Sequence, residues 1–132
     1  MGSNSELVIE ESEIRLPHFR SIRVGGNGSI AVRDSDLHTY GIFMDETVQS
    51  PNDAKTLKKL EITDSTVLTG DIIGARGGYS SVEEVVIHDS SIRLNDEYTY
   101  NYCTIGGGTN GSFGSIDIQN SQIHIPSSGG NT

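Results

Sequence analysis

A short pattern of apolar and polar positions recurs five times along the chain. It consists of an apolar residue, any residue, an acidic or amide residue, Ser, any residue and a second apolar residue. The copies occupy residues 9–14, 32–37, 62–67, 87–92 and 118–123, and their serines are 23, 30, 25 and 31 residues apart. This spacing falls in the ~20–50-residue period that is typical of repeat architectures.

Each copy predicts two short strands joined by a tight turn. Successive residues of a strand face opposite sides, so apolar residues five positions apart face the same interior only if the chain turns between them. Asp and Asn favour such turns, which places the turn at the acidic or amide position. We therefore expect two inward columns, one of Ile9, Val32, Ile62, Ile87 and Ile118, the other of Ile14, Leu37, Val67, Ile92 and Ile123.

Glycine-rich segments fall between the copies, at residues 24–26, 73–77 and 105–108. Because glycine accepts a positive φ, they predict corners where a strand ends sharply. Residues 52–60 carry a helix signal, which predicts one or two helical turns inside a long loop.

Stacked at ~4.8 Å, the copies predict an all-β solenoid, a parallel β-helix of about five coils. Hydrophobic residues make up 33% of the 132 residues, which suits a solenoid because each coil contributes few inward side chains. We expect residues 1–6 to be a disordered start or a remnant of cloning. Residues 7–126 are expected to form a single β-helix domain and residues 127–132 a flexible tail.

The repeats resemble those of the pectate-lyase-type right-handed β-helix superfamily. The Ile-x-Asp/Asn-Ser-x-Ile copies are similar to the turn that carries the asparagine ladder of that fold, and Ile105-Gly106-Gly107-Gly108 is similar to its glycine-rich repeats in secreted or surface proteins. The resemblance implies a right-handed solenoid and a secreted or cell-surface location. The chain lacks the Gly-His-Gly and Arg-x-Lys segments of the superfamily's hydrolases, so we expect no catalytic residues.

The formal charge of −9 narrows the choice of partners. An acidic surface repels phosphate backbones, so we expect no nucleic-acid partner. No run approaches the ~18 apolar residues of a membrane span, so we expect no membrane insertion. The single cysteine, Cys103, is expected to be a buried apolar residue rather than a nucleophile.

The turn positions form the first candidate site, a column of Glu11, Asp34, Asp64, Asp89 and Asn120. Stacked carboxylates repel one another, so they need either a cation or backbone donors. Calcium suits such oxygen ligands. The other interpretation, which we prefer, is that each carboxylate caps its own turn, with no cofactor and no bound metal.

A group of aromatic residues forms the second candidate site. Tyr98, Tyr100 and Tyr102 alternate and would face one side of an extended segment, with Asp96 beside them and Tyr79 one coil earlier. Aromatic faces next to carboxylates suit sugar recognition. The competing interpretation is that the rings cover one flank of the core.

Three functions remain open from the sequence. We prefer a non-catalytic β-helical module of a secreted or surface protein, whose partner is a polysaccharide or a surface protein. The second is a carbohydrate-active enzyme, a polysaccharide lyase or glycoside hydrolase, or a fragment of one. The third is a structural spacer or self-associating solenoid, because open solenoid ends must be capped, continued by a longer chain or paired end to end.

Overall fold

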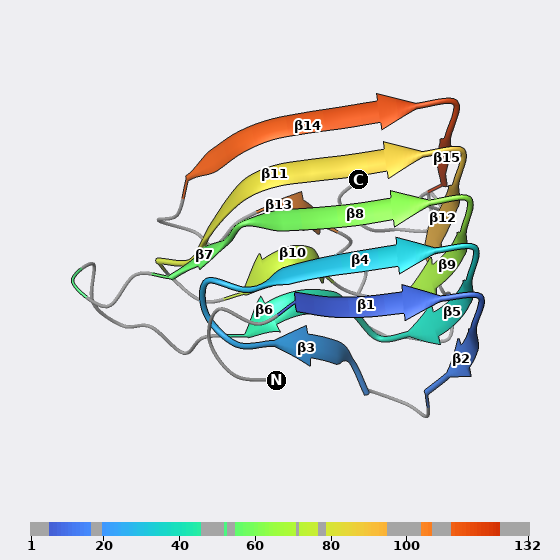
Figure 1. Cartoon of the computed structure of the whole chain (residues 1–132), viewed down its shortest axis with the longest axis horizontal. Coiled ribbons are helices and arrows are strands. Elements are labelled where there is room, and N and C mark those ends of the chain that lie inside the picture. The colour runs from blue at the N-terminus through green and yellow to red at the C-terminus, as the bar shows by residue number, and fades with distance from the viewer. Residues whose placement is uncertain are drawn as a thin grey trace, which may run out of the picture.

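The fold consists of parallel β-strands arranged in three sheets (Figure 1). The computed structural model describes residues 6–16, 20–45, 52, 55–70, 72–76, 79–94, 104–106 and 112–124. These residues form fifteen strands and contain no α-helix. The all-β class predicted from the repeats is therefore confirmed.

Strand order within each sheet follows the order along the chain. The first sheet contains β1 (Glu6–Glu10), β4 (Ser29–Arg33), β8 (Lys59–Thr63), β11 (Ser81–His88) and β14 (Phe113–Gln119), and β7 (Thr56–Leu57) also pairs with β11. The second sheet contains β2 (Glu13–Arg15), β5 (Asp36–Thr39), β9 (Thr66–Thr69), β12 (Ser91–Leu94) and β15 (Gln122–His124). The third sheet contains β3 (Ile22–Val24), β6 (Ile42–Asp45), β10 (Ile72–Arg76) and β13 (Thr104–Gly106).

The chain passes from the first sheet to the second, then to the third, and back to the first. We call one such passage a repeat, so that β1 opens repeat 1 and β14 opens repeat 5. Figure 1 shows the strands of the first sheet stacked from β1 to β14, with the turns into the second sheet aligned along one side. The register pairs Ile9 with Val32, Val32 with Ile62, and Ile87 with both Ile62 and Ile118. The five hexads are thus superimposed, an arrangement compatible with the predicted β-helix.

One apolar core is shared by the three sheets. It includes Val32 from the first sheet, Leu37 from the second and Ile42 from the third, all fully buried. The middle members of both predicted columns are buried as expected, because each is covered by a neighbouring repeat on either side.

Repeat 5 departs from this pattern. Ile118 was expected to face the interior, but it is 42% exposed, and Ile116 is 46% exposed. The cause is its position at the end of the stack: β14 pairs with β11 on one side, and no described strand covers its other side.

Two local predictions differ from the structure. The helix predicted within residues 52–60 does not extend over residues 56–57 and 59–60, which form strands β7 and β8, although Asn52 is 3₁₀-helical. Leu57 and Leu60 are fully buried there, so strand pairing and burial outweigh the local helix signal. Gly74 lies inside β10 rather than at a strand end, with a φ of 137° that side-chain-bearing residues rarely adopt.

Candidate ligand-binding groove at the turn edge

The turns between the first and second sheets have the same backbone conformation in every repeat. Their central residues all have a φ between 47° and 51°: Glu11, Asp34, Asp64, Asp89 and Asn120. This left-handed conformation is unfavourable for most residues and is tolerated best, after glycine, by Asn and Asp. We call the line of these residues and the serines that follow them the turn edge.

The serines of the turn edge form a continuous hydrogen-bonded column, which we call the serine ladder. The hydroxyl of Ser35 donates to the carbonyl of Arg33 at 2.7 Å and accepts the N–H of Ser12 at 3.2 Å. Ser65 and Ser90 repeat both bonds, and the N–H of Ser90 donates to the hydroxyl of Ser121 at 3.1 Å. All three middle serines are buried, so these bonds satisfy polar groups that water does not reach.

The serine ladder corrects the expected role of the turn carboxylates. The bonds that hold the turns come from the serine hydroxyls, whereas the side chains of Asp34, Asp64 and Asp89 are exposed. The aspartates favour the turn because Asp tolerates a positive φ. Their carboxylates therefore remain available at the surface.

An open groove of about 690 Å³ runs along the turn edge of repeats 3 to 5. Each repeat lines it with three equivalent residues, namely the turn residue, its serine and the residue after it: Asp64, Ser65, Thr66, Asp89, Ser90, Ser91, Asn120, Ser121 and Gln122. Across the groove, the Nδ2 of Asn120 donates to the Oδ1 of Asp89 at 2.5 Å. Because the hydroxyls of Ser65, Ser90 and Ser121 are used in the ladder, the other side chains, including Ser91, supply the remaining polar atoms of the groove.

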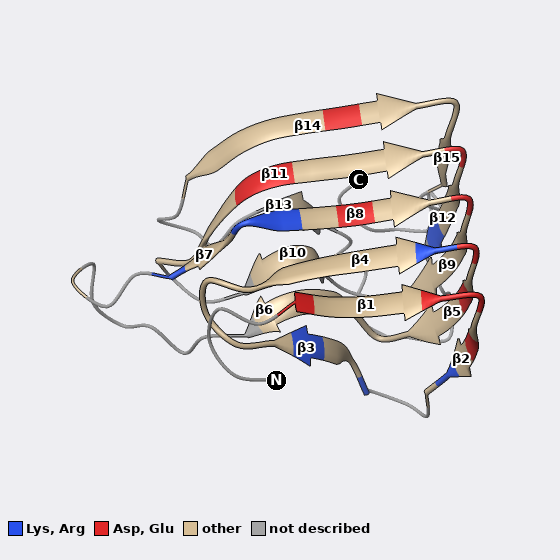
Figure 2. Cartoon of the chain, in the orientation of Figure 1, with Lys and Arg blue, Asp and Glu red and all other residues tan. Residues whose placement is uncertain are grey.

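A second, more acidic groove of about 530 Å³ lies along repeats 1 to 3 and shares Asp64 and Thr66 with the first. It is lined by Glu11, Ser12, Glu13, Asp34, Ser35, Asp36, Asp64 and Thr66. Figure 2 shows acidic residues following the turns from β1 up to β11, so negative charge runs along most of the turn edge. Arg15 offsets part of it, since its Nε lies 2.8 Å from the Glu13 carboxylate.

The outer face of the first sheet, next to the turn edge, carries two paired clusters. Arg33 bridges Glu10 and Glu61 at 2.9 Å each, and the hydrogen bond with Glu10 contributes most to raising the pKa of the guanidinium. In the second cluster, a hydrogen bond from Gln119 and then one from His88 lower the pKa of the Asp117 carboxyl. Both clusters pair their charges across neighbouring strands on a solvated sheet face.

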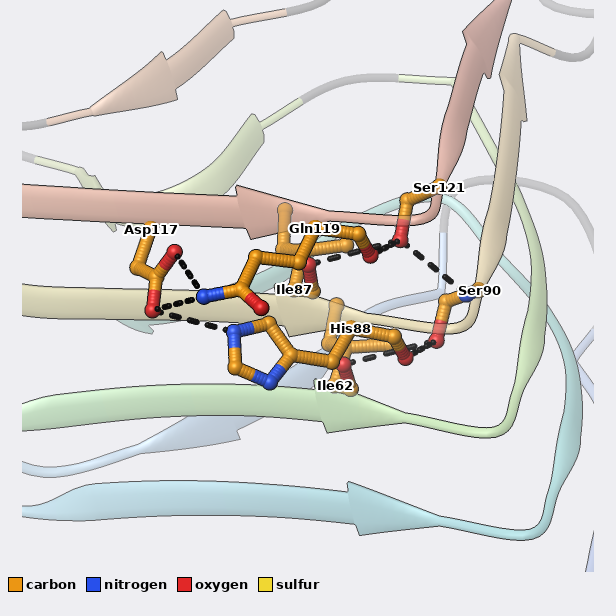
Figure 3. A network of polar contacts seen from close by, with 7 residues as sticks. All are labelled: Ile62, Ile87, His88, Ser90, Asp117, Gln119 and Ser121. Carbon is orange, nitrogen blue, oxygen red and sulfur yellow. Dashed lines mark hydrogen bonds and ion pairs between the residues drawn. The ribbon is translucent and has the colours of Figure 1, made fainter.

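The residue types of a nucleophilic triad occur together at Ser90, His88 and Asp117. Their geometry differs from that of a triad (Figure 3). The His88 ring lies on the outer face, 3.0 Å from Asp117. The Ser90 hydroxyl instead points along the chain and donates to the backbone carbonyl of His88 at 2.7 Å. A nucleophilic serine needs a base within hydrogen-bond reach of its hydroxyl, and here that hydroxyl is bonded to the carbonyl.

No cluster of three or more His, Cys, Asp or Glu side chains suited to a metal ion is found within the described ranges. The turn-edge carboxylates belong to successive repeats and do not converge on one point. In the same part of the chain, no helix has the length and apolar character needed to cross a membrane.

The predicted aromatic site is only partly visible. Tyr98, Tyr100, Tyr102 and Asp96, like Cys103, lie outside the described residues. Tyr79 is half-buried just before β11, whereas the groove begins just after that strand. The eight residues of β11 span about 26 Å at ~3.3 Å per residue, so Tyr79 does not belong to the groove.

Sequence reasoning found the turn column but missed the serine ladder and the groove. The signal for the ladder was present, because Ser follows the turn residue in all five copies. A side chain required only by its own turn could have been Thr, Asn or Asp in some copies. The strict repetition of Ser indicates contact between successive copies.

Comparison of the chain with protein-family models, with curated proteins and with solved structures finds no match. The fold and the site define the chain as an all-β protein with parallel sheets and an open polar groove along one edge. The resemblance to the pectate-lyase-type superfamily remains a prediction from the repeats.

Proposed function

We propose that this chain is a non-catalytic module with a right-handed parallel β-helix fold that binds carbohydrate along its turn edge. The observation that carries the proposal is the open groove of about 690 Å³ whose polar lining repeats in register over three successive repeats. The aligned strand orders of the three sheets support the solenoid part of the proposal.

The groove offers the functional groups that sugar hydroxyls need. A sugar hydroxyl both donates and accepts hydrogen bonds. The carboxylates of Asp64 and Asp89 accept, whereas the amides of Asn120 and Gln122 and the hydroxyl of Thr66 do both. Because these groups stack at ~4.8 Å per repeat, the lining favours an extended polymer of similar units over a compact small molecule.

Two features favour binding without catalysis. Three of the four groove serines, Ser65, Ser90 and Ser121, are held in the ladder, with their hydroxyls donating to backbone carbonyls. The groove is also open and surrounded by solvent-exposed turn residues, whereas general acid–base chemistry relies on sites that shift pKa values by burial.

Direct titration of the full chain with a panel of acidic and neutral polysaccharides tests this function. Asp89→Gly removes one groove carboxylate and keeps a residue that accepts positive φ, so the fold is retained. Loss of a hydrogen bond to a charged group predicts affinity weaker by about ten-fold or more. Glu11→Gly is the matched control, because it removes the same charge at the same backbone conformation outside this groove.

The outcomes separate the alternatives. Weakened binding by Asp89→Gly alone supports the groove. If Asp89→Gly leaves binding unchanged and Tyr100→Ala abolishes it, the carbohydrate site lies in the segment around Tyr100 instead. Release of new reducing ends or unsaturated sugars during the titration overturns the non-catalytic proposal, and absence of binding across the panel overturns carbohydrate recognition.

A further inference from the structure

The two ends of the strand stack have complementary surfaces, and we infer that a second copy of this chain stacks its repeat 1 onto repeat 5 of the first. This contact would continue the first and second sheets across the junction. The inference does not rest on carbohydrate binding, although Asn120, Ser121 and Gln122 belong both to this end of the stack and to the groove.

The apolar side chains of repeat 5 lack the cover that their counterparts have. Phe113, Ile116 and Ile118 are 38%, 46% and 42% exposed, whereas the equivalent Val82, Val85 and Ile87 of repeat 4 are buried to 1% or less. Extending the observed register by one step places Ile118 opposite Ile9 and Ile116 opposite Leu7 of the second copy. The junction therefore repeats the aliphatic pairing of the interior.

The hydrogen-bonding groups at the two ends also match. In the interior, a turn residue donates its N–H to the repeat above, as Asp64 does to the His88 carbonyl at 3.1 Å. The serine carbonyl accepts from that repeat, as Ser65 does from the N–H of Ser91 at 2.9 Å. Within the described repeats, these hydrogen bonds between successive repeats end at repeat 5. Repeat 5 therefore offers the N–H groups of Asn120 and Ser121 and the carbonyl of Ser121. Repeat 1 offers the complement: the Glu10 carbonyl, the Ser12 hydroxyl oxygen and the Glu13 N–H are equivalent to the Thr63 carbonyl, the Ser65 hydroxyl and the Thr66 N–H that bond repeat 3 to repeat 2. The Glu10 carbonyl also accepts from the Ser12 hydroxyl, as the Thr63 carbonyl does from that of Ser65.

Charge favours this head-to-tail pairing over the joining of two repeat 1 ends. Repeat 1 presents the exposed carboxylates of Glu10, Glu11 and Glu13, and the same positions of repeat 5 are the amides Gln119, Asn120 and Gln122. Arg33 and Arg15 offset the charges of Glu10 and Glu13, so the carboxylate of Glu11 carries most of the argument. The amide–carboxylate pair already occurs one step inside, where Asn120 donates to Asp89. Joining two repeat 1 ends would instead oppose like charges, which destabilises directly opposed strands.

A head-to-tail contact of this kind does not close on itself, so it generates linear assemblies whose length depends on concentration. Sedimentation velocity and light scattering of the 132-residue chain over a range of concentrations measure this directly. We expect the mean mass to rise with concentration. A chain that remains monomeric at every concentration overturns the inference.

Ile118→Lys tests the apolar part of the contact. It places an ammonium group in the junction and is expected to weaken association by about ten-fold or more. Val86→Lys is the matched control, because Val86 is the neighbour of Glu61 and Asp117 on the outer face of the first sheet, away from both ends. Equal loss of association by both variants overturns the assigned surface.

Asn120→Asp with Glu11→Asn tests the polar part without disturbing the core. Asn120→Asp alone opposes the Glu11 carboxylate of the next copy and is expected to weaken association by about two- to five-fold. It also replaces the hydrogen bond to Asp89 within the chain by a like-charge contact. That change is the same in the single and the double variant, so the comparison between the two isolates the junction. Adding Glu11→Asn restores an amide–carboxylate pair and should restore association. Both changes keep residues that tolerate positive φ, so folding, checked by circular dichroism, is retained. Failure of the second change to restore association overturns the proposed register.

Discussion

Ser65 shows at the scale of one residue why the turn edge holds together. Its hydroxyl donates to the Thr63 carbonyl at 2.7 Å and accepts the N–H of Ser35, 30 residues earlier, at 3.1 Å. One small side chain thus closes its own turn and joins two repeats. A buried N–H that loses its acceptor suffers the full desolvation cost.

Ser65→Ala should therefore lower the free energy of unfolding by about 1–3 kcal/mol, because it leaves the buried Ser35 N–H unpaired. Urea denaturation followed by circular dichroism measures the change. Thr66→Ala is the control, since it removes an exposed hydroxyl next to Ser65 and should change stability by less than about 0.5 kcal/mol. Equal denaturation midpoints for the two variants would show that the serine ladder contributes no stability.

The turn residues contribute through the backbone instead. Asp34, Asp64 and Asp89 share a φ near 50° with Glu11 and Asn120, although their side chains differ in charge and length. The conformation, rather than the carboxylate, is common to all five. This explains how the turn edge keeps one geometry while its surface chemistry changes from acidic in repeat 1 to amide in repeat 5.

At the scale of the strand, Gly114 controls how closely β14 approaches β11. A Cβ at this position would clash with the carbonyl oxygen of Glu83, and the φ of Gly114 is not in the left-handed region. Glycine is therefore required here by the close approach of two backbones rather than by its own conformation.

We expect Gly114→Ala to lower the free energy of unfolding by about 1–3 kcal/mol, because the backbone of β14 must shift to make room. Ser115→Ala, at the next position of the same strand, serves as the comparison, and its exposed side chain predicts a change near zero. Thermal and chemical denaturation measure the stability of the two variants. An alanine at 114 that leaves stability unaltered would mean that the two strands do not approach this closely in solution.

At the scale of the molecule, stability should be uneven along the stack. Repeats in the middle are covered on both sides, whereas the end strands β1, β2, β14 and β15 pair with a described neighbour on one side only. In stacked repeats each unit is stabilised mainly by its neighbours, so the end units open more readily.

Hydrogen exchange followed by mass spectrometry should therefore find β8 and β11 the most protected strands of the first sheet and the end strands β1 and β14 the least protected. The measurement is made at the lowest practical concentration, where end-to-end stacking is weakest. Raising the concentration should then slow exchange selectively in β1 and β14, because the proposed contact pairs these two strands. Uniform protection of all five strands of the first sheet at low concentration would contradict the gradient.

The sequence by itself determined the repeating unit. The five hexads, the position of the turn, the strands on either side of it and the inward columns in the middle of the stack all follow from alternation and turn chemistry. These are local properties, because each depends on residues within about six positions of one another. The residues of the turn edge could therefore be identified from the sequence. The sequence did not show that the serines form the hydrogen bonds while the acidic and amide residues provide the positive φ.

Only the tertiary structure decided what happens between repeats. The serine ladder joins residues 23 to 31 positions apart, and the contact at Gly114 depends on a carbonyl in another strand. The exposure of Ile118 depends on what lies above it, which its own hexad does not encode. The physical reason is that hydrogen bonding, close packing and burial at these positions depend on how the loops superimpose the repeats, whereas alternation and turn preference act within each repeat alone.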